Sequence, residues 1–325
     1  MKISILGTGA YGLALALSLN KGNNEISMWT KLEQEKEEIT TKHSYEKVLP
    51  NVIIPQSIKV TTNIQEAIKE KELIIIAIPA NFVASVSNEL KDYITPNQHI
   101  CIATKGIEQN SCLFMDQIIT NIINTNNISV ISGPSFAIDT VSNNPIGLNL
   151  ASTNDKTIEI VKEAFHNTNI KLMVNNDILG TELCGSIKNI YAIACGILDG
   201  LNTNESTTSM FLTKAILNLQ KLITDLGGNN ETVLSYAGFG DLILTCTSTK
   251  SRNYTLGKLI ATSDNKAINE YKENNTIEGL YTLKSIIQLI TKYNIKSKLI
   301  EIINNIVYEN HNPQILIAFL LDKNN

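Results

Sequence analysis

The chain has 325 residues, of which 43% are hydrophobic and 18% charged, and it carries a formal net charge of −4. This composition is typical of a globular protein and excludes a disordered one. The weak negative charge, without a long basic run, argues against nucleic acid as the main partner. No uninterrupted apolar run reaches about 18 residues, so we expect no transmembrane helix. The length predicts two domains, because a single core rarely grows this large.

The five cysteines give no sign of a disulfide framework or a metal site. They lie at Cys101, Cys112, Cys184, Cys195 and Cys246, an odd number with no C-x-x-C pair. Disulfide scaffolds and structural zinc sites use paired or closely spaced cysteines. We therefore expect a cytoplasmic protein with reduced thiols and no bound metal.

The first twenty residues combine a short strand, a glycine-rich turn and a helix. The apolar run 3–6 predicts a buried strand, Gly7, Gly9 and Gly12 give the spacing G-x-G-x-x-G, and residues 13–19 predict a helix. In a strand-turn-helix unit these glycines make the tight turn, admit a pyrophosphate and allow close helix packing. Two alternatives are a glycine-rich turn in an unrelated βαβ unit and a signal peptide. The glycines interrupt the apolar run that a signal peptide requires, so the sequence favours a dinucleotide site.

The residues after the second expected strand, 25–29, bear on the choice of cofactor. An acidic residue at this place would bind the adenosine ribose hydroxyls and repel a 2′-phosphate. This chain has Thr30 and Lys31 there instead. A lysine can accept a 2′-phosphate, so NADPH is allowed. The alternative is that Lys31 is merely solvated at the start of a helix.

The pattern up to residue 178 alternates between strands and helices. Further strands are expected at 58–61, 73–78, 99–103, 128–132, 146–151 and 170–174, and helices at 34–47, 64–71, 82–90 and 112–123. The β-branched run 73–78 is typical of a central parallel strand that is buried on both faces. This alternation predicts a Rossmann-type, doubly wound, mostly parallel α/β domain over residues 1–178.

From residue 179 onward strand signals are nearly absent. Apolar residues recur with helical spacing at 183–198, 210–226, 267–272, 279–293 and 299–308. The sequence therefore predicts an all-α C-terminal domain over residues 179–325.

Lys188 is the first candidate for chemistry, because it is the only charged residue between Glu182 and Asp199. A lysine among apolar and small neighbours is costly to bury unless its pKa falls or it gains partners. Such a lysine can act as a general acid or base. The alternative is a side chain that extends to solvent from an otherwise buried helix.

Two polar segments follow in the helical domain. Asp241 comes after glycines and before an apolar run, which fits either a helix N-cap or a carboxylate that holds a catalytic lysine or substrate hydroxyls. Ser251, Arg252 and Asn253 form a polar run in which the arginine offers a bidentate fork to phosphate. A single arginine on a loop is usually only solvated, so this candidate depends on its neighbours.

Together these motifs resemble the bacterial NAD(P)-dependent glycerol-3-phosphate dehydrogenases, over roughly residues 2–282. The matching segments are 7–12, 48–50, 103–108, 132–137, 185–189, 238–242, 244–248, 251–253 and 277–279. The resemblance implies NAD(P)H as cofactor and the reversible reduction of dihydroxyacetone phosphate to sn-glycerol 3-phosphate, which would supply phospholipid synthesis. It also implies a homodimer formed through the helical domain.

The resemblance also implies residue roles. Lys188 looks like the catalytic lysine that protonates the developing alkoxide, and Asp241 like the carboxylate that orients it. The implied substrate contacts are Lys105, Gly133, Ser135, Lys188, Asp241, Ser251, Arg252 and Asn253. The implied cofactor contacts are Gly7, Gly9, Ala10, Tyr11, Gly12, Lys31, Lys105, Ala137, Arg252, Ile277 and Glu278.

The chain departs from the family pattern after the helix that carries Lys188. Lys214 and Ala215 replace a usual arginine-glycine pair, Thr208 replaces a basic residue, and a usual Pro-Ile near position 297 is missing. These changes leave two alternatives open. One is a related two-domain reductase of another small hydroxy or keto acid, and the other is a divergent nucleotide-binding protein with weak or no turnover.

Overall fold

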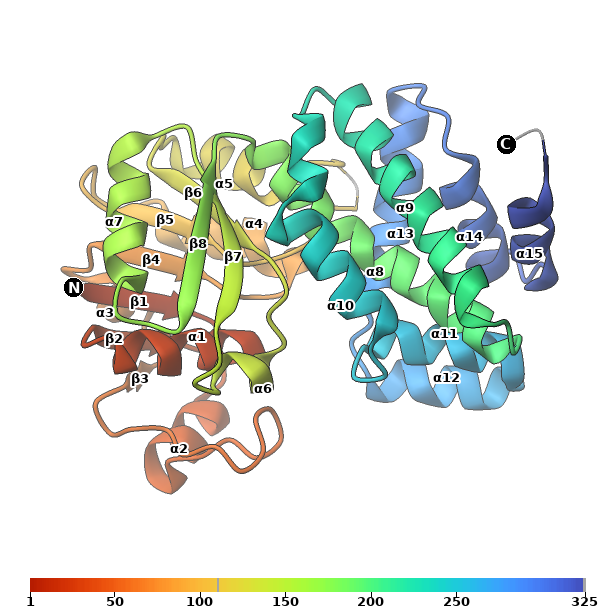
Figure 1. The fold of residues 1–325 in the computed structure, drawn as a ribbon. Coiled ribbons are helices and arrows are strands. Elements are labelled where there is room, and N and C mark those ends of the chain that lie inside the picture. Colours follow the sequence, from red (N-terminus) through yellow and green to blue (C-terminus); the bar gives the residue numbers. More distant parts are fainter. Residues whose placement is uncertain (110, 324–325) are drawn as a thin grey trace. The chain divides into compact units, whose positions relative to one another are not determined.

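The computed structural model describes residues 1–109 and 111–323. The chain divides into two compact units (Figure 1). Unit 1 comprises Met1–Lys105 and Phe114–Ile178, and unit 2 comprises Gly106–Leu113 and Leu179–Asn325. Residues 106–113 thus cluster with the helical unit. They are tied to it where the Ser285 hydroxyl donates to the Ile107 carbonyl at 2.9 Å.

Unit 1 contains one eight-stranded sheet. Its strands are β1 (Lys2–Leu6), β2 (Glu25–Trp29), β3 (Lys59–Thr61), β4 (Leu73–Ile76), β5 (His99–Ile102), β6 (Ile128–Ser132), β7 (Ile146–Ala151) and β8 (Ile170–Asn175). Their order is β3-β2-β1-β4-β5-β6-β7-β8. Every neighbouring pair is parallel except β6 and β7. The expectation of a doubly wound, mostly parallel sheet is confirmed.

The helices of unit 1 correct several expected boundaries. They are α1 (Ala10–Lys21), α2 (Glu33–Lys42), α3 (Ile64–Ile68), α4 (Val83–Leu90), α5 (Met115–Ile123), α6 (Ala137–Thr140) and α7 (Asp155–Phe165), with a 3₁₀ turn at Ala80–Phe82. The helix expected over 34–47 ends at Lys42, because His43 adopts the left-handed conformation with φ 52°. The helix expected from 112 starts at Met115, and Cys112 has φ 59°. Helix α7, which Asn154 caps, was not expected.

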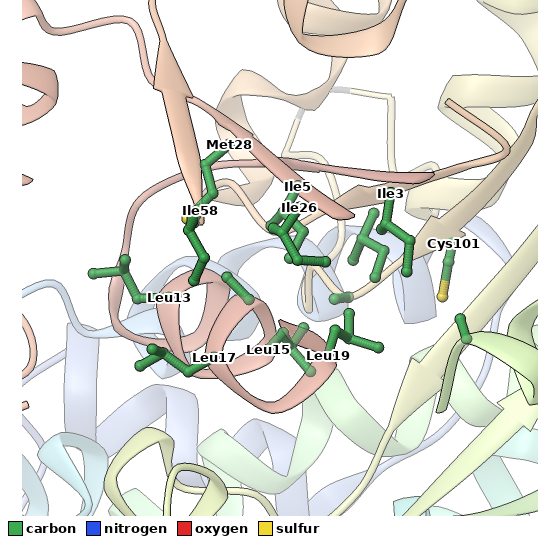
Figure 2. Close-up of a cluster of buried hydrophobic side chains, with 14 of the residues drawn as sticks. Ile3, Ile5, Leu13, Leu15, Leu17, Leu19, Ile26, Met28, Ile58 and Cys101 are labelled. Atoms are coloured by element: carbon green, nitrogen blue, oxygen red, sulfur yellow. The ribbon is translucent and has the colours of Figure 1, made fainter. Parts of the chain in front are cut away.

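The core of unit 1 forms where α1 packs on the sheet (Figure 2). Leu13, Leu15 and Leu19 of α1 are fully buried with Ile3 and Ile5 of β1. Full burial of one such side chain contributes about 1.5–3 kcal/mol. This packing holds the start of α1, and with it the glycine-rich turn, at the carboxyl end of β1.

Unit 2 is helical, as expected. Its helices are α8 (Ile178–Gly200), α9 (Glu205–Asp225), α10 (Asp241–Thr247), α11 (Arg252–Thr262), α12 (Asn265–Asn274), α13 (Glu278–Lys292), α14 (Lys298–Tyr308) and α15 (Gln314–Leu321). A 3₁₀ segment covers Asn230–Leu234 and a π-helical turn covers Tyr236–Gly240. Helices α11 and α15 were not expected. No helix in the described part of the chain is long and apolar enough to cross a membrane.

Helix α8 is buried along almost its whole length and crosses α11 at very short distance. A Cβ atom on Gly196 would lie 1.9 Å from the Tyr254 carbonyl oxygen, and one on Gly257 would lie 1.9 Å from the Ile193 carbonyl oxygen. Real side chains do not tolerate such contacts, so both crossing positions require glycine. The crossing brings the first turn of α11 to the middle of α8, where Lys188 lies.

Candidate active site

Lys188 projects from α8 into a buried polar group of unit 2. Its ammonium donates to Asp241 Oδ1 at 2.5 Å and to Thr245 Oγ1 at 3.0 Å. Lys188 is 8% exposed and Asp241 1% exposed, so the lysine does not extend into solvent. Removing one partner of such a buried pair costs about 3–5 kcal/mol, because the other charge is left uncompensated. The Lys188 ammonium is therefore held in one arrangement by Asp241 and Thr245.

Helix α10 positions the carboxylate. A π-helical turn, Tyr236–Gly240, leads directly into α10, and Asp241 is the first residue of that helix rather than its N-cap. π-Helical turns occur frequently at functional sites. One turn later Thr245 donates its hydroxyl to the Asp241 carbonyl at 2.7 Å, which directs its oxygen lone pairs toward Lys188. Thr245 was not among the candidate residues, although its i, i+4 spacing from Asp241 places both on one helix face.

A second polar group joins α8, α11 and α13. The Asn189 amide donates to Glu278 Oε2 at 3.1 Å, and its Oδ1 accepts from the Asn253 amide at 3.0 Å. Asn253 Oδ1 in turn accepts from the Gly279 amide at 2.9 Å. The structure thus brings together Asn253 and Glu278, and adds Asn189, which holds both. Ile277, the N-cap of α13, is buried beside them.

The other two residues of the polar run differ from Asn253 in their surroundings. Ser251 is buried and caps α11, accepting from the Tyr254 amide at 3.3 Å. Arg252 is the first residue of α11 and its side chain is exposed, with no ion pair to the described residues. The run therefore has two residues that build the helix start and one cation that is open to an anionic ligand.

A buried thiol contacts the backbone of Lys188. The Cys246 thiol donates to the Lys188 carbonyl at 3.9 Å. Burial raises the pKa of the Cys246 thiol well above its usual value, and the neighbouring Cys195 thiol raises it further. All five cysteines are free and buried. A buried thiol with a raised pKa, such as Cys246, acts as a packing group and not as a nucleophile. No cluster of metal-binding side chains occurs within residues 1–109 and 111–323.

The glycine-rich turn of unit 1 has the shape that a dinucleotide requires. Gly7 has φ 116° and a Cβ there would lie 2.4 Å from the Ala77 carbonyl oxygen, while a Cβ on Gly12 would lie 2.3 Å from the Gly7 carbonyl oxygen. Beside Gly9, in contrast, no atom lies within 4 Å of such a Cβ. Gly9 caps α1 without any side-chain hydrogen bond to the first turn, which begins at Ala10. The turn thus presents helix-start amides next to open space, which fits a pyrophosphate.

A further group of unit 1 lies after β5 and β6. The Lys105 ammonium donates to the Gly133 carbonyl at 3.5 Å, and the Ser135 hydroxyl donates to the same carbonyl at 3.0 Å and to the Tyr11 hydroxyl at 3.1 Å. Ala137 begins α6 next to this segment. Ligands bind at the carboxyl ends of parallel strands in such sheets. The structure therefore brings together Tyr11, Lys105, Gly133 and Ser135.

Lys31 is an exposed side chain, whereas Glu35 is held by several hydrogen bonds. The Lys31 ammonium pairs with Glu89 at 3.5 Å, and both side chains are exposed. Glu35, which the sequence analysis did not single out, accepts hydroxyl hydrogen bonds from Thr8, Thr30 and Tyr45 at 2.6, 2.5 and 3.1 Å. Burial and the Glu35 carboxylate raise the pKa of Tyr45 to about 12.

The stretch after α8 that departs from the family pattern forms a continuous helix. Helix α9 runs from Glu205 through Lys214 and Ala215, and Asn204 caps it. Ala215 is fully buried, and the Lys214 ammonium lies 5.5 Å from the ring centroid of Phe319 in α15. The replacement residues thus have packing roles of their own.

A Rossmann-type sheet with this glycine-rich turn, together with a helical unit that buries a lysine-aspartate pair, defines a nicotinamide-dependent dehydrogenase. Residues 2–158 match the family model of the NAD-dependent glycerol-3-phosphate dehydrogenase N-terminus, and residues 177–318 match that of the C-terminus. The chain belongs to the NAD-dependent glycerol-3-phosphate dehydrogenase family.

Individual relatives agree over nearly the full length. The chain is 37% identical to a glycerol-3-phosphate dehydrogenase (NAD(P)+) of Thermoanaerobacter sp., over 99% of this chain and 97% of that protein. It is 34% identical to the Fusobacterium nucleatum protein of the same name, over 96% and 94%. The crystal structure of glycerol-3-phosphate dehydrogenase from Coxiella burnetii superposes with a TM-score of 0.92 at 30% identity, covering 99% of each chain.

Proposed function

We propose that this protein is an NAD(P)H-dependent glycerol-3-phosphate dehydrogenase, which reduces dihydroxyacetone phosphate reversibly to sn-glycerol 3-phosphate. The observation that carries the proposal is the buried Lys188 ammonium, held by Asp241 and Thr245. Reduction of a ketone creates an alkoxide that needs both a positive charge and a proton. Lys188 supplies both from one atom. The product would feed phospholipid synthesis.

The chemistry divides between cofactor and protein. The nicotinamide supplies the hydride when it is bound. The ketone carbon accepts that hydride, the carbonyl π electrons move to oxygen, and the Lys188 ammonium gives this oxygen its proton. Asp241 stabilises the ammonium before the transfer, and Thr245 fixes its direction. In the reverse direction neutral Lys188 takes the proton back from the alcohol.

The substrate phosphate needs cations of its own. We propose Arg252 as its main anchor, because the guanidinium is exposed at the start of α11 and matches phosphate oxygens in a bidentate manner. We assign Lys105 to cofactor and substrate, and Gly133 and Ser135 to substrate. Ser251 and Asn253 hold the start of α11 in place: Ser251 caps the helix, and the Asn253 amide donates to Asn189. Binding energy from the phosphate would then orient the carbonyl.

Cofactor contacts are proposed for the turn Gly7–Gly12 and for five residues elsewhere in the chain. Gly7, Gly9, Ala10, Tyr11 and Gly12 form the turn and the first residues of α1. Lys31, Ala137, Arg252, Ile277 and Glu278 complete the proposed set. Glu278 is held by Asn189, which supports a fixed position for its carboxylate.

The test is the loss of nicotinamide absorbance when purified protein is mixed with dihydroxyacetone phosphate and either NADH or NADPH. Oxidation that requires both substrate and protein is the expected result. Cofactor binding without oxidation would contradict the proposal. It would then favour another hydroxy-acid substrate or a non-catalytic protein, and residues 200–215 would be examined first. The full-length relatives favour neither alternative.

Two further assignments are proposals of the same kind. A reducing, cytoplasmic location is supported by five free, buried cysteines. A homodimer formed through the helical unit is supported by Met210 and Leu217, two exposed apolar residues seven positions apart on α9. Size-exclusion chromatography with light scattering tests the dimer, and a monomer at micromolar concentration would contradict it.

A further inference from the structure

The carboxylate of Glu35 lies where the glycine-rich turn meets the end of β2. The Gly7 amide donates to the Trp29 carbonyl at 2.8 Å, which joins the turn to the last residue of β2. Glu35 Oε2 accepts from Thr8 in the turn at 2.6 Å and from Thr30 after β2 at 2.5 Å. Both threonines are nearly fully buried. The carboxylate is thus fixed from two sides.

This place has a known chemical meaning in dinucleotide-binding folds. About 20 residues after the glycine motif, an acidic side chain binds the adenosine ribose hydroxyls, and a basic one accepts a 2′-phosphate. The chain has Thr30 and Lys31 directly after β2, so the acidic group is absent there. Glu35, in the first turn of α2, brings a carboxylate back to the end of the strand.

We propose that Glu35 selects the cofactor: its carboxylate accepts a hydrogen bond from the 2′-hydroxyl of the adenosine ribose and repels a 2′-phosphate, so that the protein prefers NADH to NADPH. This inference rests on the proposed use of a nicotinamide cofactor. It reverses the expectation that Lys31 makes NADPH acceptable.

The charges around Glu35 support selection against phosphate. Its three partners are hydroxyl groups, and no Lys or Arg pairs with it among the described residues. A carboxylate accepts about four hydrogen bonds, so capacity for one more remains. Helix α2 contains four glutamates and two lysines, which adds negative charge. Lys31 is 73% exposed and already pairs with Glu89.

A purely structural role is the competing explanation, because Glu35 also ties the turn to β2 and to Tyr45. The two roles predict different results for fragments that carry only the adenosine end of the cofactor. We would titrate the protein calorimetrically with AMP and with 2′,5′-ADP, which differ only in the 2′-phosphate, using wild type, Glu35→Gln and Glu37→Gln. Glu37→Gln removes the same charge from an exposed position of the same helix. Thermal melting verifies that each variant is folded.

Selection by charge predicts that wild type and Glu37→Gln bind AMP at least about tenfold more tightly than 2′,5′-ADP. Glu35→Gln should reduce this ratio by roughly tenfold, mainly through tighter binding of 2′,5′-ADP. If Glu35→Gln lowered the affinity for both ligands equally, the proposal would be overturned. A wild type that binds 2′,5′-ADP more tightly would also overturn it. The titrations require no turnover, so a protein that binds AMP in preference to 2′,5′-ADP but does not reduce dihydroxyacetone phosphate would refute only the proposed reaction.

Discussion

The two units of this protein build their functional groups in opposite ways. In unit 1 three glycines within six consecutive positions shape a turn that presents backbone amides at the start of α1. In unit 2 Lys188 meets Asp241 and Thr245, which lie 53 and 57 residues further along the chain, and every contact uses a side chain. The glycine turn is therefore a local property of the chain, whereas the group of Lys188, Asp241 and Thr245 exists only when α8 and α10 have packed together.

Lys188→Ala should produce the largest effect. The proton donor is lost, so we expect turnover to fall at least about a thousandfold, while binding of ADP to the glycine turn is retained. Steady-state rates and calorimetry measure the two quantities separately. Lys188→Arg is the matched variant, because it keeps the charge but cannot give up a proton. Substantial activity in either variant would remove Lys188 from its proposed role.

Gly257→Ala tests how far the helical unit depends on the α8–α11 crossing. The added methyl group would lie 1.9 Å from the Ile193 carbonyl oxygen, so α11 must shift. We expect a loss of about 1–3 kcal/mol in the free energy of unfolding, together with reduced turnover, because α11 carries Arg252. Chemical denaturation measures the loss. Thr262→Ala, at an exposed position of the same helix, should change stability by less than about 0.5 kcal/mol.

Arg252→Ala separates binding from chemistry within unit 2. Loss of the guanidinium should raise the KM for dihydroxyacetone phosphate by roughly tenfold to a hundredfold, since a charge-assisted hydrogen bond contributes about 1.5–3 kcal/mol. The kcat should change much less. Lys266→Ala removes an exposed positive charge elsewhere in the unit and should leave the KM unchanged. An unaltered KM in Arg252→Ala would refute the phosphate anchor.

His99 should give the smallest effect, confined to unit 1. Burial lowers the pKa of this side chain, and Lys156 lowers it further. The folded state therefore binds its proton less readily than the unfolded state, whose histidine pKa is about 6.5. The stability that neutral His99 contributes is present above about pH 6.5 and is lost as the pH falls below that value. His99→Asn should show a smaller decrease in melting temperature between about pH 7.5 and pH 5.5 than wild type. An identical decrease would contradict this assignment.

Much of the fold could be read from local patterns. The run 3–6, the spacing of Gly7, Gly9 and Gly12, and the run 73–78 depend on neighbouring residues alone. The two runs form β1 and β4, although β4 ends at Ile76, two residues earlier than expected. Two of the missed helices show little helical periodicity, because α11 begins in a polar run and α15 is apolar on nearly every side. Helix α7 does have an apolar face and an Asn154 cap, so its local signal was present and was overlooked. The helix expected over 34–47 ended early because a left-handed residue, His43, cannot be recognised from side-chain periodicity.

The sequence determined the family, the glycine turn and the presence of one lysine in an apolar helix, because each of these depends on residue types at short spacing. Which side chains contact these groups depends on how the helices and strands pack. Asp241 and Thr245 reach Lys188 because α10 packs against α8, and Glu35 reaches Thr8 and Thr30 because α2 returns to the end of β2. Such contacts join residues that are distant in the chain, and their partners are set by packing rather than by spacing.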